Sequence, residues 1–417
     1  MKRILFLTDM WSPQATANSV CVKNIANVLK RRNWEVYVDA FEGKTGQQSE
    51  VIDGIFVEYT RPGLSRQLLT RAKFIDDSIK KRIMITLGVW LNRVIRILNL
   101  PYYPVADSLF VKRWSDQVIK RIQKDDIDIV ISVNAPTDSI AAGYLVKRKC
   151  PKVKWVAYYI DGGTNYGKEQ NFLKIKKSLQ NKAVKWENKI LEIADAIVVM
   201  EGHSQYYKKM LNESNRSRLK ILNVPLFCQN QIQRNGSTAK GRDKEIWTYM
   251  GTIREKCYNP ERLLSWFLWY SSIHEAELHL YGATDIEDYL QTKCDGKHIF
   301  YHGFISHDQV TKILADSDVL IYFVSEKLDS VSGKFFEYLM YGKPIVYFGP
   351  KEDINWLQLE KYPLGLAIDQ DTGEQTKSFE EILNKSCSIS EDVLTQIFYT
   401  STPDAFADAI EEMETEG

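Results

Sequence analysis

The chain has 417 residues, of which 44% are hydrophobic and 26% are charged, a composition typical of a globular protein with two or three domains. Its formal net charge of +1 argues against broad nucleic-acid binding, because such proteins carry a basic excess. The six cysteines form no Cys-x-x-Cys pair, as expected for free thiols in a reducing cytoplasm.

Short β-branched or aromatic runs alternate with amphipathic segments, which is the pattern of parallel β/α units. In the first half this predicts strands at 3–8, 35–40, 129–134, 154–160, 196–200 and 220–223. Asp9 interrupts the first apolar run before a signal-peptide core is complete. The uncharged stretch 83–92 has about half of the ~20 residues that a membrane span needs.

The second half repeats the pattern, with strands expected at 246–250, 277–281, 299–301, 319–323, 345–348 and 365–368. Helices are expected at 260–273, 307–315 and 333–341. We therefore assign residues 1–225 and 246–400 to two Rossmann-like domains, 226–245 to a polar linker, and 401–417 to a helix that can pack back on the first domain. Open parallel sheets bind ligands at the carboxyl ends of their strands, so the active site is expected in a cleft between the domains.

The densest group of chemically useful side chains follows the strand at 319–323. Ser332 stands where it can cap a helix, whose first N–H groups attract phosphate, and Lys334 adds a full positive charge in the same turn. Glu337, one turn later, can accept hydrogen bonds from ribose hydroxyls. The alternative is that Ser332 only caps the helix and that Lys334 and Glu337 form a solvated face.

These residues resemble a motif of the retaining GT-B glycosyltransferases of the family-four type. Asp329 and Glu337 are eight positions apart, and a Gly342-Lys343-Pro344 turn follows. The resemblance implies a GT-B fold, a ribose ligand role for Glu337, and a place for Asp329 near the donor sugar. It also implies that Ser332, Gly333 and Lys334 contact the donor and that no metal or other cofactor is needed.

Two further turns of the second half resemble the same family. Residues 249–256 look like its strand and glycine turn, which implies that Gly251 approaches the donor and that Arg254 and Lys256 clamp the diphosphate; the alternative is a surface loop with incidental charge. Residues 301–306 look like the turn that contacts the nucleobase, where Gly303 permits a close approach. Phe304 packs either on the base or in the core.

The first half contributes two candidate catalytic carboxylates that follow strand ends, Asp138 and Asp161, although each can instead stabilise local structure. The loop 9–18 takes the place of the family's glycine-rich loop without its paired glycines. His298 and His302 bracket a strand, where four residues span about 13 Å, so they cannot share a metal ion.

Residues 61–96 contain nine Lys or Arg against two acids, interleaved with large apolar residues. This insertion, at about 61–100, predicts a peripheral contact with an anionic membrane, or alternatively a helical insertion with a solvated basic face.

We expect a cytoplasmic hexosyltransferase, peripheral at the inner membrane face, that moves a sugar from a nucleotide-sugar, expected to be UDP-linked, to a lipid-linked saccharide in surface polysaccharide synthesis. The absence of Gly-x-Gly-x-x-Gly and Walker motifs argues against redox and NTPase chemistry. The alternatives are a sugar-nucleotide epimerase or hydrolase of the same fold, or a non-catalytic protein that binds sugar-nucleotides.

Overall fold

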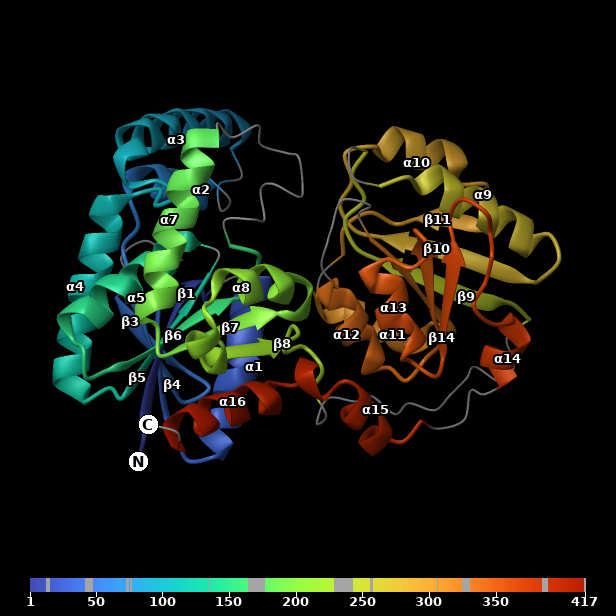
Figure 1. Ribbon diagram of the computed structural model, residues 1–417. Coiled ribbons are helices and arrows are strands. Elements are labelled where there is room, and N and C mark those ends of the chain that lie inside the picture. Colours follow the sequence, from blue (N-terminus) through green and yellow to red (C-terminus); the bar gives the residue numbers. More distant parts are fainter. Residues whose placement is uncertain are drawn as a thin grey trace. The chain divides into compact units, whose positions relative to one another are not determined.

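The computed structural model in Figure 1 describes residues 1–12, 16–41, 48–72, 75, 77–134, 136–163, 177–228, 243–255, 258–305, 307–324, 331–384 and 389–415. It divides into two compact units. The first comprises Met1–Pro225 together with Pro403–Gly417, and the second comprises Leu226–Thr402.

The first unit is built on an eight-stranded sheet whose order is β3-β4-β2-β1-β5-β6-β7-β8. All neighbouring strands are parallel except the β3–β4 pair. The strands are β1 (Arg3–Met10), β2 (Glu35–Phe41), β3 (Ser49–Ile52), β4 (Ile55–Thr60), β5 (Ile129–Val133), β6 (Lys154–Tyr159), β7 (Ala196–Met200) and β8 (Leu219–Leu222). Strands β5 and β7 are buried at every residue, as expected for parallel strands covered on both faces.

The helices of this unit are α1 (Ala17–Arg31), α2 (Leu64–Ala72), α3 (Ser78–Leu98), α4 (Ser108–Asp125), α5 (Thr137–Lys149), α7 (Lys177–Ile193), α8 (Ser204–Met210) and α16 (Pro403–Thr415). Short 3-10 turns are η1 (Leu100–Tyr102), η2 (Glu201–His203) and η3 (Glu213–Arg218). Helices α4, α5 and α7 pack around a core whose largest members include Trp114 and Trp155.

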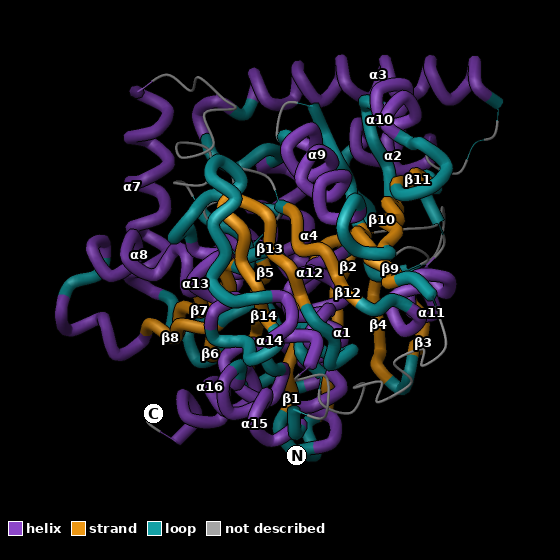
Figure 2. Tube along the Cα trace, turned by 90° about the vertical axis from the view of Figure 1, so that its right-hand side faces the viewer, coloured by secondary structure: helices purple, strands orange, loops and turns teal. Residues whose placement is uncertain are grey.

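Helix α3 runs unbroken along the margin of the first unit, with α2 against it (Figures 1 and 2). The two helices approach closely at Gly88, where a β-carbon would lie 3.0 Å from Cγ of Leu69 and 3.2 Å from the Ser65 carbonyl oxygen. No helix within the described ranges has the length and apolar character needed to cross a bilayer.

The second unit contains a six-stranded parallel sheet with the order β11-β10-β9-β12-β13-β14. Its strands are β9 (Glu245–Met250), β10 (Ala276–Tyr281), β11 (Ile299–Tyr301), β12 (Val319–Phe323), β13 (Ile345–Gly349) and β14 (Gly365–Asp369). Numbered from β9, the order reads 3-2-1-4-5-6, which is the doubly wound order with a switch point between β9 and β12.

The helices of the second unit are α9 (Pro260–Ser271), α10 (Glu287–Lys293), α11 (His307–Asp316), α12 (Gly333–Leu339), α13 (Ile354–Glu360), α14 (Phe379–Asn384) and α15 (Glu391–Ile397), with a 3-10 turn η5 (Tyr399–Ser401). A buried aromatic cluster around Trp247 of β9 joins α9 to α14 through Tyr270 and Phe379. The predicted α/β class with parallel sheets in both halves is therefore confirmed.

The sequence interpretation omitted the β3–β4 hairpin at the edge of the first sheet. Asp53 and Gly54 both have positive φ, 53° and 70°, and they turn β3 into β4. An Asp-Gly pair between β-branched runs favours this type of tight hairpin, so the signal was present in the sequence.

Candidate functional site

The switch point of the second sheet lies where the turn after β9 meets α12. Because all six strands are parallel, β9, β10 and β11 end at the same edge. Each is followed within two residues by a glycine: Gly251, Gly282 and Gly303. Backbone hydrogen bonds connect the three turns. The N–H of Gly251 donates to the carbonyl oxygen of Tyr281 at 2.8 Å, and the N–H of Gly282 donates to the carbonyl oxygen of Gly303 at 2.8 Å.

Two of these glycines cannot be replaced without movement of their neighbours. A β-carbon at Gly282 would lie 2.2 Å from the carbonyl oxygen of Gly251, and Gly282 also has a φ of +133°. A β-carbon at Gly251 would lie 1.8 Å from Nζ of Lys334. Gly303 has a φ of +72° with no atom within 4 Å of its missing β-carbon, so its conformation rather than crowding favours glycine.

Lys334 of α12 crosses from the switch-point helix to the β9 turn. Its ammonium donates to the Tyr249 hydroxyl at 3.1 Å and lies 4.8 Å from the centre of that ring. Burial lowers the pKa of Lys334 to about 8, while the Glu337 carboxylate acts in the opposite direction. A lysine held in this way regains its full charge when an anion binds beside it.

Helix α12 is fixed to the same turn by Tyr338. The backbone N–H of Met250 donates to the Tyr338 hydroxyl at 3.1 Å, and the neighbouring Phe335 and Phe336 are fully buried. Glu337, between these anchors, is exposed. The helix therefore presents Lys334 and Glu337 one turn apart while its other side is locked into the unit.

Ser332 occupies the N-cap position of α12, with an extended backbone, but its side chain makes no capping bond. Its N–H instead donates to the Tyr322 hydroxyl at 3.0 Å. At Gly333 a β-carbon would lie 2.8 Å from Cδ1 of Leu226, so this glycine allows close packing. The prediction that the Ser332 side chain caps this helix, which both interpretations of the segment shared, is therefore wrong.

The remaining predicted residues of this half are distributed around the glycine turns. Arg254 is exposed, four residues after the end of β9. Phe304 is 81% exposed beside Gly303, so the alternative of a core role is wrong and the side chain is accessible to a flat ligand. Asp329 and Lys256 lie outside the described residues.

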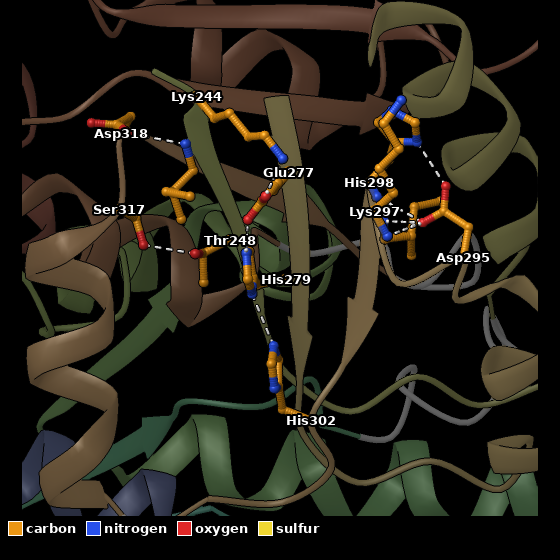
Figure 3. A network of polar contacts seen from close by, with 12 residues as sticks. Lys244, Thr248, Glu277, His279, Asp295, Lys297, His298, His302, Ser317 and Asp318 are labelled. Carbon is orange, nitrogen blue, oxygen red and sulfur yellow. Dashed lines mark hydrogen bonds and ion pairs between the residues drawn. The ribbon is translucent and has the colours of Figure 1, made fainter. Parts of the chain in front are cut away.

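Figure 3 shows a network of polar contacts on and next to strands β9, β10 and β11, which lead into these turns. Lys244 pairs with Glu277 at 2.8 Å, Glu277 contacts His279 at 3.3 Å, and His279 contacts His302 at 2.9 Å. His298 belongs to a separate cluster, in which its Nδ1 lies 2.7 Å from Asp295. Among the described residues, no group of three or more His, Cys, Asp or Glu is placed to hold a metal ion.

In the first sheet, Asp161 lies just after the end of β6 and Asp9 lies near the end of β1. Asp9 accepts hydrogen bonds from Thr16 Oγ1 at 2.7 Å and Ser19 Oγ at 2.8 Å. Burial raises the pKa of Asp161, and the charge of Asp9 raises it further, while a hydrogen bond from Asn18 lowers it. The two carboxyl groups therefore influence each other at this sheet edge.

The turn that contains Asp161 packs against Glu187, a residue that the sequence analysis did not identify. Glu187 of α7 is fully buried, and a β-carbon at Gly163 would lie 2.0 Å from its Oε1. The Tyr207 hydroxyl donates to the same oxygen at 2.9 Å. In the sequence Glu187 looks like one more charged residue of an amphipathic helix, so no local pattern identifies this contact.

Asp138 has a structural position. It is 1% exposed, forms an ion pair with Arg66 of α2, and accepts a hydrogen bond from the Ala106 backbone at 3.1 Å. It thus ties the α2 region and the segment before α4 to the start of α5, and we leave it out of the proposed catalytic set.

No family model matches the chain, and no curated protein matches its sequence. Solved structures match at full length. Sucrose-phosphate synthase from Thermosynechococcus elongatus is 13% identical, with a TM-score of 0.65 and 100% of both chains covered. The lipopolysaccharide outer core galactosyltransferase WaaB is 11% identical, with a TM-score of 0.57 and 98% of this chain and 99% of the other covered. Anabaena HepE in complex with UDP and glucose is 12% identical, with a TM-score of 0.52 and 100% of this chain and 98% of the other covered.

These neighbours are GT-B glycosyltransferases, and the predicted GT-B fold is confirmed. At 9–13% identity the likeness establishes the fold alone.

Proposed function

We propose that the protein is a glycosyltransferase that uses a nucleoside diphosphate sugar, expected to be a UDP-sugar. The observation that carries this proposal is Lys334, which lies against Gly251 at the switch point of the second sheet with its pKa lowered to about 8. A doubly wound sheet binds a nucleotide at this edge, and a partly dehydrated lysine there suits a diphosphate. Structures with the same fold include HepE bound to UDP and glucose.

In this proposal the donor contacts are divided among the glycine turns and α12. Gly303 and Phe304 contact the base, Glu337 accepts from the ribose hydroxyls, and Gly251, Ser332 and Gly333 approach the diphosphate. Arg254, Lys256 and Lys334 stabilise the negative charge that develops on the leaving diphosphate, where preorganised cations lower the barrier most. The family resemblance assigns Asp329 to the donor sugar, and in this proposal the reaction retains the anomeric configuration without a metal ion.

The acceptor binds at the edge of the first sheet that carries Asp161. A carboxylate with a raised pKa is a better proton acceptor near neutral pH, which suits contact with an acceptor hydroxyl. We further propose that the acceptor is a lipid-linked saccharide of a surface polysaccharide. The lipopolysaccharide enzyme WaaB shares the fold and supports this choice.

The membrane contact is assigned to α3. Its large apolar side chains remain exposed, among them Ile79 at 70%, Ile83 at 60%, Trp90 at 59% and Ile97 at 64%. These four recur at helical spacing on one stripe, and Arg82, Arg93 and Arg96 flank it. Helix α2 covers a different face of α3, at Gly88, so the stripe is available to an anionic bilayer at the inner face of the membrane.

The test is a thermal-shift panel of nucleotide-sugars, followed by product analysis with the best donor and a lipid-linked acceptor. Lys334→Met should weaken donor binding by about ten- to more than a hundredfold, since a hydrogen bond to a charged group contributes ~1.5–3 kcal/mol. Lys297→Met, which removes an exposed lysine of the same unit, should leave it unchanged. Product that forms without acceptor would indicate an epimerase or hydrolase, and donor binding without turnover would indicate a non-catalytic protein.

A further inference from the structure

The first unit contains a cavity of about 730 Å³ that none of the candidate site residues line. It lies among the segment after α3, the start of α4, and the sides of α5 and α7. Its size falls within the range typical of small-molecule sites. Much of its wall is apolar or aromatic, with contributions from Tyr103, Val105, Leu109, Tyr144, Leu145 and Trp186.

Five lysines surround this apolar wall: Lys112 of α4, Lys149 of α5, and Lys182, Lys185 and Lys189 of α7. All five are exposed, and no Asp or Glu among the described residues lines the cavity. The three on α7 are three and four positions apart, where like charges destabilise a helix. Intrahelical stability therefore does not account for this stripe.

The positive charge of these five lysines is only partly neutralised by other groups of the protein. Lys149 pairs with Asp116 at 2.8 Å, and Lys182 donates to the Leu100 carbonyl at 2.9 Å. In the part of the chain that the structure describes, Lys112, Lys185 and Lys189 form no ion pair. Lys112 is close enough to Asp116 to lower the pKa of that carboxyl group, so Lys185 and Lys189 are the two cavity lysines with neither an acidic partner nor a carbonyl partner among the described residues.

An apolar wall surrounded by lysines fits a molecule that has a hydrocarbon chain and an anionic head group. Each methylene transferred from water to such a wall raises affinity about fourfold, and the lysines supply point charges for a phosphate. A nucleotide or an acidic peptide would need several polar partners on the wall, whereas the wall residues named above are apolar or aromatic.

The position of the cavity indicates the source of such a molecule. Helix α3 ends at Leu98, and η1 follows at Leu100–Tyr102 and leads directly to the cavity wall at Pro101–Tyr103. Ile97, Leu98 and Tyr102 are 64%, 70% and 59% exposed along this path. An exposed apolar path therefore connects the stripe of α3 with the cavity.

We propose that this cavity binds one chain of an anionic membrane phospholipid, with its phosphate on Lys112, Lys185 and Lys189. The site goes beyond the proposed sugar transfer, because its residues are separate from those assigned to donor and acceptor. It also differs from the nonspecific contact of α3, since it takes a single lipid molecule with a defined head group.

The experiment uses the full-length protein and dodecyl phosphate below its critical micelle concentration, without donor or vesicles. Calorimetric titration should show one site in the wild type. Lys185→Ser/Lys189→Ser should weaken this binding by about ten- to more than a hundredfold, because two contacts to the phosphate are lost. The matched control is Lys208→Ser/Lys209→Ser, which removes two exposed lysines of α8 outside this cavity and should bind like the wild type.

Two further probes separate the parts of the proposal. Dodecyl maltoside should bind at least tenfold more weakly than dodecyl phosphate, and inorganic phosphate should bind more weakly still. Equal binding of dodecyl maltoside, or inorganic phosphate as tight as dodecyl phosphate, would overturn the assignment. Hydrogen exchange with dodecyl phosphate should protect 101–109 and 182–189, and protection confined to other segments would also overturn it.

These outcomes are independent of the proposed enzyme. Lipid binding measured without donor can fail while sugar transfer persists, and it can succeed in a protein that transfers no sugar. The double lysine variant should keep donor affinity and melting temperature, since the substituted residues are exposed and touch no proposed donor contact.

Discussion

Lys334 lies in an environment that lysines rarely occupy unless an opposite charge is nearby. Its ammonium lies against the Gly251 backbone and the Tyr249 ring, and its pKa is lowered to about 8 by burial. A lysine with this lowered pKa loses its proton more readily than an ordinary lysine near pH 8. A bound diphosphate favours the charged form, so donor binding is coupled to protonation.

We predict that donor binding near pH 8 is accompanied by proton uptake, and that affinity falls as the pH rises through and above this range. The sign follows because the pKa is low in the free protein and higher in the complex, so the complex binds more protons. Titration calorimetry in buffers with different ionisation enthalpies measures the uptake. Lys334→Met should abolish it, and an unchanged uptake in that variant would assign the proton to another group.

Glu337 provides a second test at this scale, because it is exposed while its neighbours Phe336 and Tyr338 are buried. Glu337→Gln keeps the size but removes the charge, and donor affinity should fall by about ten- to more than a hundredfold, corresponding to ~1.5–3 kcal/mol. The free energy of unfolding should change by no more than about 0.5 kcal/mol. Titration of the donor, beside a melting curve for each protein, distinguishes the two effects.

The control is Glu380→Gln on α14, which removes an exposed carboxylate far from α12 in sequence and should leave affinity unchanged. If a folded Glu337→Gln protein bound donor as tightly as the wild type, the ribose assignment would be untenable.

Individual site residues could be predicted only where the chemistry is local in sequence. The group from Ser332 to Glu337 is visible because a strand, a helix start and the charges occur within one short segment. The contact between Lys334 and Gly251 joins residues 83 positions apart, and nothing in the sequence indicates that the lysine lies on that glycine. Likewise Phe304 is apolar in a sequence where such residues are mostly buried, yet it is 81% exposed.

At the scale of elements, the pattern of apolar residues was sufficient to predict the strands that lie in the interior of each sheet. The residues of β5, β7, β12 and β13 are buried on both faces, and their sequences are runs of mostly apolar residues, with Ser132 as a polar member of β5. The edge hairpin β3–β4 was missed because β3 alternates exposed with partly buried residues and is only four residues long. Its Asp53-Gly54 turn was a stronger signal than its periodicity.

Helix α3 gives the prediction that belongs to this scale. The protein should bind anionic liposomes reversibly, and added salt should weaken the binding, because screening reduces the attraction of the flanking arginines. Ile83→Ser/Trp90→Ser should lower the partition coefficient into the vesicles by at least tenfold, since each apolar side chain gains about 1.5 kcal/mol or more when it leaves water. Vesicle co-sedimentation measures both effects.

Leu357→Ser is the matched control, because Leu357 of α13 is 50% exposed in the other unit. If the protein bound neutral vesicles as strongly as anionic ones at every salt concentration, the proposed electrostatic attraction would be contradicted. Absence of binding to either vesicle would remove the membrane contact of α3.

At the scale of the whole molecule, the last helix of the chain belongs to the first unit. Helix α16 buries Phe406, Ile410 and Met413, and the Phe406 ring lies 4.8 Å from the ring of Tyr158 in β6. Arg32, just after α1, contacts three of its carboxylates: Asp408 at 2.5 Å, Glu411 at 2.9 Å and Asp404 at 3.0 Å. The first unit is therefore discontinuous in sequence, because part of its core comes from a helix that follows the whole second unit in the chain.

We predict that truncation after Thr402 destabilises the first unit and spares the second. Burial of a large apolar side chain contributes about 1.5–3 kcal/mol, so three of them account for about 5–9 kcal/mol, which is comparable to the whole stability of a domain. Hydrogen exchange should increase in β1, β5 and β6 and remain slow in β9 and β12. Arg32→Met should destabilise the first unit less, by about 1–2 kcal/mol, because the apolar contacts remain and solvent screens the partly exposed carboxylates that lose their shared cation. Equal loss of protection in both sheets would mean that the units do not unfold separately, and unchanged protection in β6 would mean that α16 contributes nothing to its core.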